Sequence, residues 1–167
     1  DDDSASKNKK VVVIGSGPNR IGQGIEFDYC CVHGVESLKE NNYEAIMINS
    51  NPETVSTDYD TADKLYFEPL SWDEVKAVLA REKPDSVIIQ LGGQTPLKLA
   101  DKISSAGFKI AGSSLDVIDA TEDRDLFQKL CLSLNIDQPK SKISFNEDEL
   151  ISAVKDITYP VLLRPSY

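Results

Sequence analysis

The sequence is poor in the residues that build disulfide frameworks and most metal sites. It has three cysteines, of which Cys30 and Cys31 are adjacent, and a single histidine, His33. An odd number of cysteines without C-x-x-C spacing excludes a disulfide framework and a paired-thiolate metal site, and it predicts a protein of the reducing cytoplasm. We interpret His33, beside Val32 on a predicted helix, as a packing or surface residue.

Long apolar runs and clustered positive charge are also missing. No run approaches the ~20 apolar residues of a membrane helix, so we expect no membrane association. Residues 1–6 are polar, which predicts no signal peptide, and we interpret residues 1–7 as a disordered leader or an expression remnant. The formal net charge is −10, with 18 Lys and Arg against 28 Asp and Glu spread along the chain, which argues against a nucleic-acid partner.

Strand and helix signals alternate along the first 120 residues. Continuous apolar runs predict buried strands, and apolar residues three to four apart predict the helices between them. Four βα units with short loops predict an α/β fold, a parallel, right-handed, doubly wound sheet with helices on both faces. The predicted strands are 10–14, 44–49, 86–90 and 108–111. The predicted helices run from Ile25 to about Asn41, from a capping box at 71–74 to before Pro84, and from Thr95 to Gly107.

The remaining residues change in composition and predict the truncated start of a second domain. Thr121 is expected to cap a helix that reaches Leu134, and a capping box at 146–149 precedes a helix that reaches Ile157. The segments 140–145 and 161–164 have the apolar pattern of strands. At 167 residues, the chain has room for one ordinary domain and a fragment, or for two very small domains.

A glycine-rich loop with Gly15, Gly17, Gly22 and Gly24 follows the first predicted strand. A dinucleotide site needs G-x-G-x-x-G and an acidic residue at the end of the second strand. Here Pro18 and Ile21 interrupt the glycine pattern, and residues 49–51 contain no acid. The sequence therefore disfavours nicotinamide binding. A helix N-terminus with Arg20 still attracts an anion, although the glycines are also explained by a tight turn alone.

Two more polar loops are expected at the same edge of the sheet. Residues 49–60 carry Glu53, Asp58 and Asp60, and residues 91–96 read Leu-Gly-Gly-Gln-Thr-Pro. Each alone is compatible with a solvated turn, but three polar loops at the carboxyl edge of one sheet predict a binding site.

Two arginines stand at positions from which they could clamp a phosphate. Arg124 opens a predicted helix, and Arg164 ends a predicted strand. The alternative for Arg124 is an ion pair with its neighbours Asp123 and Asp125. That alternative is weaker for Arg164, because it follows the apolar segment 161–163, which we expect in a core.

Taken together, these motifs resemble the large subunit of carbamoyl-phosphate synthase. They occur in the family's order and spacing, at residues 15–29, 51–58, 92–95, 122–124 and 164–167. The resemblance implies two homologous halves, each with a Rossmann-like pre-ATP-grasp domain followed by an α+β ATP-grasp domain. Residues 18–20 and 24–25 resemble the second half, which phosphorylates carbamate. Ser16, commonly Gly in bacterial members, departs from the pattern.

The resemblance implies a domain organisation and a set of site residues. Residues 8–120 would form the pre-ATP-grasp domain, and residues 121–167 the incomplete N-terminal portion of the ATP-grasp domain. Arg124 and Arg164 match arginines that contact the nucleotide phosphates. The residues that match the internal passage for carbamate are Gly24, Glu26 and Glu53. No catalytic residue and no metal ligand of the family falls within these 167 residues, so the fragment alone is expected to be inactive.

The activity implied is that of an ATP-dependent, glutamine-hydrolysing ligase. It makes carbamoyl phosphate from bicarbonate, ammonia and two MgATP, for arginine and pyrimidine biosynthesis in the cytoplasm. The implied partners are a small amidotransferase (glutaminase) subunit and the rest of the large subunit. The implied cofactors are ATP with Mg²⁺ or Mn²⁺, with K⁺ as a further cation, none of them bound to this fragment.

Two other functions stay open at this point. One is a free-standing, non-catalytic binding or assembly module, against which the apolar strand predicted at 161–164 argues because it needs more sheet. The other is an NAD-dependent enzyme, which the interrupted glycine pattern disfavours.

Overall fold

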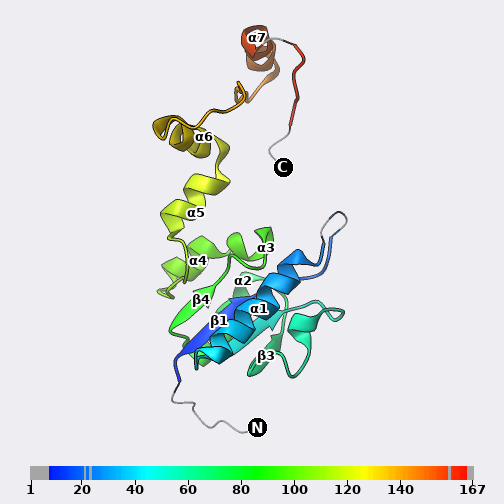
Figure 1. Cartoon of the computed structure of the whole chain (residues 1–167), viewed down its shortest axis with the longest axis vertical. Helices are drawn as coiled ribbons and strands as arrows, with labels where there is room; N and C mark the ends of the chain where they lie inside the picture. Colours follow the sequence, from blue (N-terminus) through cyan, green and yellow to red (C-terminus); the bar gives the residue numbers. More distant parts are fainter. Residues whose placement is uncertain (1–7, 21, 23, 158, 165–167) are drawn as a thin grey trace. The chain divides into compact units, whose positions relative to one another are not determined.

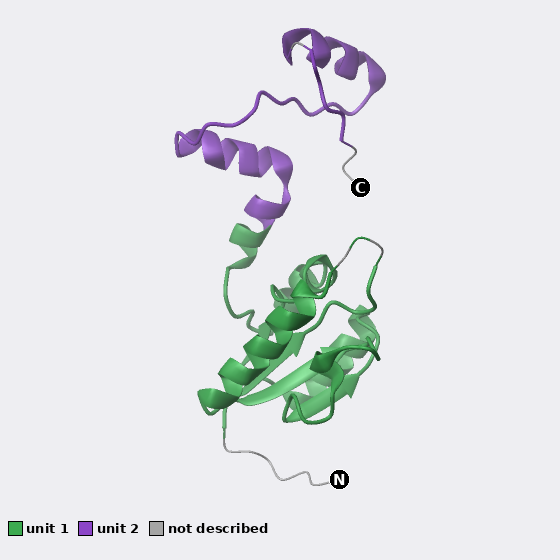
Figure 2. Ribbon diagram, turned by 45° about the vertical axis from the view of Figure 1, so that its right-hand side comes forward, with its two compact units in different colours: residues 1–118 green, residues 119–167 purple. Residues whose placement is uncertain are grey.

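The chain is divided into two compact units. The computed structural model describes residues 8–20, 22, 24–157 and 159–164. One unit lies within residues 1–118 and the other within residues 119–167 (Figure 2). The leader expected at residues 1–7 lies outside the described residues.

A parallel sheet with strand order β3-β2-β1-β4 forms the centre of the first unit (Figure 1). Its strands are β1 (Lys10–Ile14), β2 (Glu44–Asn49), β3 (Lys64–Phe67) and β4 (Ser86–Ile88). The predicted α/β class with a parallel sheet is therefore confirmed. The first two strands have the predicted bounds. Their central residues form continuous apolar runs, which are typical of parallel strands that are buried on both faces of the sheet.

The sheet differs from the prediction at its two edges. Strand β3 pairs with β2 but was not predicted, because it is four residues long and follows a polar loop. Strand β4 ends at Ile88 rather than at residue 90. The fourth strand predicted at 108–111 is a single parallel bridge between Val87 and Ile110.

Helices cover both faces of the sheet, as predicted. On one face, α1 (Glu26–Glu40) packs Cys31 and Val35 against β1 and β2, and it crosses in front of the sheet in Figure 1. On the other face lie α2 (Trp72–Glu82) and α4 (Ala100–Ser105). Alternate strand residues serve the two layers: Val13, Ala45 and Met47 face α1, whereas Val12, Ile14, Ile46 and Ile48 face α2 and α4.

Two details of the predicted helices in this unit are wrong. Ser71 is the N-cap of α2, but its hydroxyl bonds to the Glu74 carboxylate instead of accepting a backbone N–H, so the capping box is incomplete. The helix predicted from Thr95 to Gly107 is two helices, α3 (Gln94–Leu97) and α4. Between them, Leu99 N donates to Pro96 O at 3.0 Å. This hydrogen bond has the spacing of a 3₁₀-helix and interrupts the α-helical pattern.

Helices dominate the second unit. They are α6 (Arg124–Ser133) and α7 (Glu147–Ile157), while α5 (Leu115–Glu122) spans the division between the units. The cap of α6 is Asp123, whose carboxylate accepts from Asp125 N and Leu126 N, and not Thr121, which lies inside α5. The cap predicted for α7 at Asn146 is confirmed, because Asn146 Oδ1 accepts from Glu149 N at 2.9 Å; the Glu149 carboxylate, however, accepts from Phe145 N instead of Asn146 N.

The two strands predicted in this unit are not formed. Within the described residues, segments 140–145 and 161–164 form no regular secondary structure and pair with no strand. Leu162 is 91% exposed, so the expected core position is also wrong. An amphipathic pattern gives a strand only where a neighbouring strand supplies its hydrogen bonds. No helix in the described part of the chain has the length and apolar character to cross a membrane.

A network of charges holds the amino-terminal end of the sheet. The carboxylate of Glu82, at the end of α2, accepts from Lys10 Nζ (2.9 Å), Lys64 Nζ (3.1 Å) and the Tyr66 hydroxyl. Lys64 also pairs with Glu44, at 3.2 Å. Burial alone would raise the pKa of Glu82, but the hydrogen bonds from Tyr66, Lys10 and Lys64 outweigh it and lower the pKa to about 2.

We predict that Glu82→Gln destabilises the protein at neutral pH by roughly 2–3 kcal/mol, because two lysines and a tyrosine lose a charged acceptor. The ordinary pKa is 4.5 and the folded pKa about 2, so this contribution is complete above pH 4.5 and disappears as the pH falls through 2. Urea unfolding from pH 7 to pH 2 should show the two proteins converging in acid. Glu68→Gln, an exposed position just after β3, should change little; a gap that stays constant with pH would contradict the assignment.

Candidate functional site

The loops that follow β1 and β4 make close backbone contact at the carboxyl edge of the sheet. A Cβ on Gly92 would lie 2.6 Å from the carbonyl carbon and oxygen of Gly15 and 2.7 Å from the oxygen of Ile14. Gly15 N in turn donates to Ile48 O of β2, at 2.8 Å. Glycine is therefore required at 92, and three strands deliver their loops to one place, as the sequence predicts.

Asn49, the last residue of β2, joins these loops through its side chain. Its Oδ1 accepts from Gly17 N and from Ser50 N, both at 2.9 Å, and its Nδ2 donates to Ser56 Oγ at 3.0 Å. Asn49 is 1% exposed, and Ser56 is fully buried. An amide fits here because it both donates and accepts, which a carboxylate cannot do. The position that binds ribose in dinucleotide folds is thus occupied by a structural amide.

The loop after β2 is held against α1 by further hydrogen bonds. Asn51 Oδ1 accepts from Glu53 N at 3.1 Å, and the Thr57 hydroxyl donates to Asn51 O at 2.6 Å. At the short helix η1 (Val55–Thr57), Ser56 N donates to Asp28 Oδ2 of α1 at 3.3 Å. The loop is therefore internally hydrogen-bonded, while its acidic residues Glu53, Asp58 and Asp60 are exposed to solvent.

One cleft, which we call the glycine-loop cleft, opens at this edge with a volume of about 570 Å³. Arg20 is the one charged residue in its lining among the residues that the structure describes, and it is exposed. Pro69 and Leu70, which follow the unpredicted strand β3, complete the wall and were missed by the sequence analysis. The other lining residues are Ser16, Gly17, Pro18, Asn19, Ser50 and Thr95. Hydroxyls, an amide and one arginine suit an anionic ligand.

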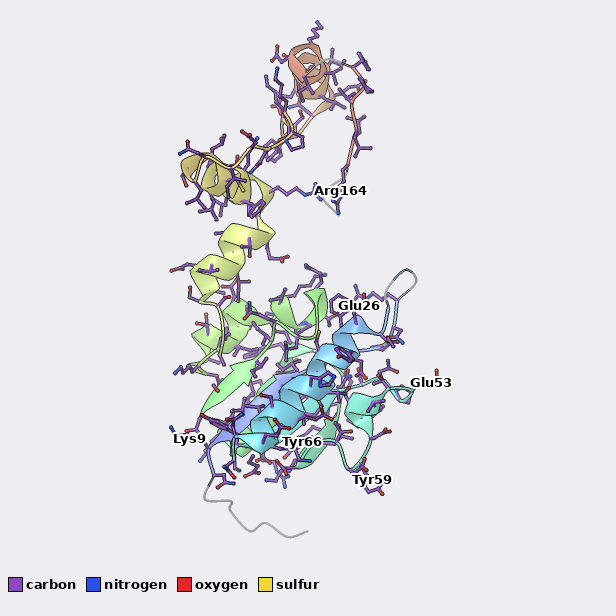
Figure 3. The ribbon with its side chains drawn as sticks, viewed as in Figure 1. Lys9, Glu26, Glu53, Tyr59, Tyr66 and Arg164 are labelled. Atoms are coloured by element: carbon purple, nitrogen blue, oxygen red, sulfur yellow. The ribbon has the colours of Figure 1, made fainter. Side chains whose placement is uncertain are left out.

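A second cleft of about 550 Å³, the helix-start cleft, lies between the first turns of α1 and the loop after β2. Its lining residues are Ile25, Asp28, Tyr29, Val32, Pro52, Glu53, Thr54, Val55 and Asp58. Glu53 is thus in this cleft, whereas Gly24 and Glu26 are outside its lining, on either side of Ile25. Figure 3 shows Glu26 at the start of α1 and Glu53 in the neighbouring loop, with Lys9 at the opposite end of the unit.

Gly24 and Glu26 contact each other. Gly24 N donates to Glu26 Oε1 at 3.4 Å, and a Cβ on Gly24 would lie 2.1 Å from Glu26 Oε2. The small residue at 24 therefore leaves the space that the Glu26 carboxylate occupies. Two of the three residues expected along a passage, Gly24 and Glu26, are therefore in contact. The third, Glu53, lies in the adjacent helix-start cleft.

Both candidate phosphate-binding arginines are exposed and belong to the second unit. Arg124 is the first residue of α6. The ion pair expected as its alternative is not formed among the described residues, because Asp125 pairs with Lys129 and Asp123 caps the helix. Arg164 ends the segment 161–164, which forms no regular secondary structure. Ile21 and the rest of the last motif, residues 165–167, lie outside the described residues.

Comparison with known proteins identifies the family. The family described as the carbamoyl phosphate synthase pre-ATP-grasp domain matches residues 7–120, well over half of the chain. The chain belongs to this family. The carbamoyl phosphate synthase large chain of Gemmatimonas aurantiaca is 58% identical over 159 residues, which are 95% of this chain and 14% of that protein. The carbamoyl phosphate synthase large chain, C-terminal section, of Aquifex aeolicus is 58% identical over 160 residues, 96% of this chain and 30% of that protein.

Solved structures share the fold of this carbamoyl phosphate synthase family member at low sequence identity. The biotin carboxylase domain of a single-chain bacterial carboxylase aligns with a TM-score of 0.59 and 12% identity, over 89% of this chain and 34% of that one. An L-amino acid ligase from Bacillus licheniformis aligns with a TM-score of 0.50 and 12% identity, over 91% of this chain and 43% of that one. These likenesses show the fold alone.

We predict that Gly92→Ala destabilises the protein by about 1–3 kcal/mol, because its Cβ would meet backbone atoms that cannot move aside. The matched control is Gly34→Ala in α1, whose Cβ would meet only the end of the Leu91 side chain, at 2.4 Å. A gain in helix propensity of ~1 kcal/mol should offset that contact. Thermal unfolding of both variants measures the difference, and equal costs would contradict the requirement at Gly92.

Proposed function

We propose that the chain is a segment of the carbamoyl phosphate synthase large chain, from the half that phosphorylates carbamate. The observation that carries this proposal is the family match over residues 7–120 together with 58% identity to a C-terminal section of the large chain. The chain spans 14–30% of the length of the relatives named above. In this assignment, residues 8–120 form the pre-ATP-grasp domain, and residues 121–167 begin the ATP-grasp domain.

The parent enzyme in this proposal is a glutamine-dependent ligase that makes carbamoyl phosphate from bicarbonate, ammonia and two ATP. A carbamate oxygen attacks the γ-phosphorus of ATP, and ADP leaves. Catalysis of phosphoryl transfer rests on positioning and on neutralising charge at the phosphoryl oxygens. We assign Arg124 and Arg164 to contacts with the nucleotide phosphates, for which a planar, permanently charged guanidinium is suited.

The described residues do not themselves provide a metal site. No group of three His, Cys, Asp or Glu side chains in that part of the chain is arranged to hold a metal ion. The ligands of Mg²⁺, Mn²⁺ and K⁺ would then lie in the rest of the large chain. The 167-residue chain alone is accordingly proposed to be inactive. Its proposed partners are the remaining large chain and a small glutaminase subunit, in the cytoplasm, serving arginine and pyrimidine synthesis.

The residues Gly24, Glu26 and Glu53 are proposed to line the passage that carries carbamate to this half. The contact between Gly24 and the Glu26 carboxylate supports this proposal, because the absence of a side chain at Gly24 makes room for a polar group that can replace water. Glu53 lies in the cleft that begins beside Glu26, at Ile25.

We expect a calorimetric titration of the 167-residue chain with MgATP to give no heat or very weak heat, because most of the nucleotide pocket lies elsewhere in the parent. A parallel titration with NADH should be silent, since Asn49 is committed to the loops and no acid is present for the ribose. Saturable NADH binding in the micromolar range would overturn the assignment and return the glycine loop to a dinucleotide.

For the passage, we predict that Glu26→Gln in the full-length large chain, assembled with its glutaminase subunit, lowers the yield of carbamoyl phosphate per ATP consumed. The partial ATPase reactions should stay intact, because the change lies away from the phosphates. Glu40→Gln, at the other end of α1, is the matched control and should leave the yield unchanged. An unchanged yield for Glu26→Gln would exclude the passage role.

A further inference from the structure

Gln90, the second residue after β4, bonds through its side chain to a turn further along the chain. Its Oε1 accepts from Ser113 N at 3.0 Å, across 23 positions of sequence. The turn fits closely around this oxygen, because Gly112 has φ +96° and a Cβ there would lie 2.4 Å from Gln90 Oε1. Gln90 lines neither of the two clefts, so this hydrogen bond belongs to a feature separate from them.

The turn at residues 112–113 stands where the chain leaves the sheet. Before it, Val87 N donates to Lys109 O and Val87 O accepts from Ala111 N, both at 2.8 Å, which fixes the chain beside β4. After it, α5 begins, and Ile118 of that helix is packed in the core. Backbone pairing therefore fixes the chain up to the turn, and packing fixes it beyond the turn. The hydrogen bond from Gln90 holds the turn itself.

A short helical path leads from this turn to Arg124. The hydrogen bonding of α5 continues past its last residue, since Asp123 N donates to Asp119 O at 3.0 Å. Asp123 is also the cap of α6, whose first residue is Arg124. A helix rises ~1.5 Å per residue, so a tilt of about 5° at the start of α5 moves its other end by about 1 Å.

We propose that Gln90 is a positioning residue for the carbamate-phosphorylating step. It holds the turn at 112–113 and so sets the direction in which α5 starts toward Arg124. Gln90 touches no substrate and acts through Arg124, so the inference rests on the proposed function, in which Arg124 contacts the nucleotide phosphates. A misplacement of about 1 Å at such a group is enough to lower the rate or the affinity.

The first test is kinetic and uses the full-length large chain assembled with its glutaminase subunit. Formation of ATP from carbamoyl phosphate and ADP, the reverse of the step proposed for this half, gives the KM for ADP. Gln90→Leu removes the acceptor and should raise this KM by about threefold to tenfold, the range expected for one hydrogen bond. Gln90→Glu keeps an oxygen acceptor and should stay within about twofold of the unchanged protein.

The matched control is Lys109→Leu, at an exposed position on the segment that leads into the same turn. It should leave the KM for ADP unchanged. A bond at Gln90 that serves stability alone would lower the temperature of thermal unfolding in Gln90→Leu and leave the KM unchanged, and that result would overturn the proposal.

Arg124→Lys separates the role of Gln90 from the proposed function. Lysine cannot bond to phosphate in the bidentate manner of arginine, so this change alone should raise the KM for ADP. Adding Gln90→Leu should then raise it by less than about twofold more, because two changes that act on one contact are not additive. Full additivity would overturn the role of Gln90 alone. An unchanged KM in Arg124→Lys would overturn the phosphate contact of Arg124, and with it the action of Gln90 through that contact.

The second test examines the turn directly by hydrogen exchange in the same full-length proteins. The amide of Ser113 should exchange at least about fivefold faster in Gln90→Leu, and Gln90→Glu should restore its protection. Residues 46–48, in the buried part of β2, report any general loss of stability. Equal exchange at Ser113 in all three proteins would show that Gln90 does not hold the turn and would overturn the proposal, whatever the kinetics of the Arg124 variant.

Discussion

The arrangement of the carboxyl edge depends on one buried amide. Asn49 ends a strand whose residues are all buried, and its side chain takes up the N–H groups of Gly17 and Ser50 while donating to Ser56. Each of those partners belongs to a loop whose backbone leaves regular structure and needs a replacement hydrogen bond. Removing the amide would take this partner from the buried Ser56 hydroxyl and from the N–H groups of Gly17 and Ser50 at once, which is why the two clefts on either side of this loop depend on it.

The strands of the sheet were predictable to different degrees. Residues 11–14 and 45–48 are continuous apolar runs, which is the pattern of strands that helices cover on both faces of a parallel sheet. Strand β3 escaped prediction because it is short and half-buried, so its pairing with β2 is decided by packing far along the chain. The converse failure occurred at 140–145 and 161–164, where a strand-like pattern finds no neighbouring strand among the described residues. The alternation of apolar and polar residues shows only that a segment is amphipathic. Whether it pairs as a strand depends on the rest of the fold.

The location of the candidate site could be predicted from the sequence, but the hydrogen bonds that hold its loops together could not. The polar loops and the absence of an acid at 49–51 are visible in the sequence, and they led to the correct edge of the sheet. The hydrogen bonds from Asn49 to Ser56 and Gly17, which lie 7 and 32 positions away in the sequence, could not be predicted. Nothing in the neighbouring sequence distinguishes a structural amide from one that binds a ligand. Helix caps show the same limit: Asn146 was recognised, whereas Asp123 was overlooked in favour of Thr121, two residues earlier.

The two ends of the sheet are held by different forces. Around Glu82 the strands start among full charges, whereas at the other end Asn49 works through neutral amides and hydroxyls. Ionic strength and acidity therefore act more strongly on the charged network around Glu82 than on the neutral hydrogen bonds that Asn49 makes. A substitution that changes the charges around Glu82 can therefore alter how stability depends on pH and salt without touching the hydrogen bonds that Asn49 makes beside the clefts.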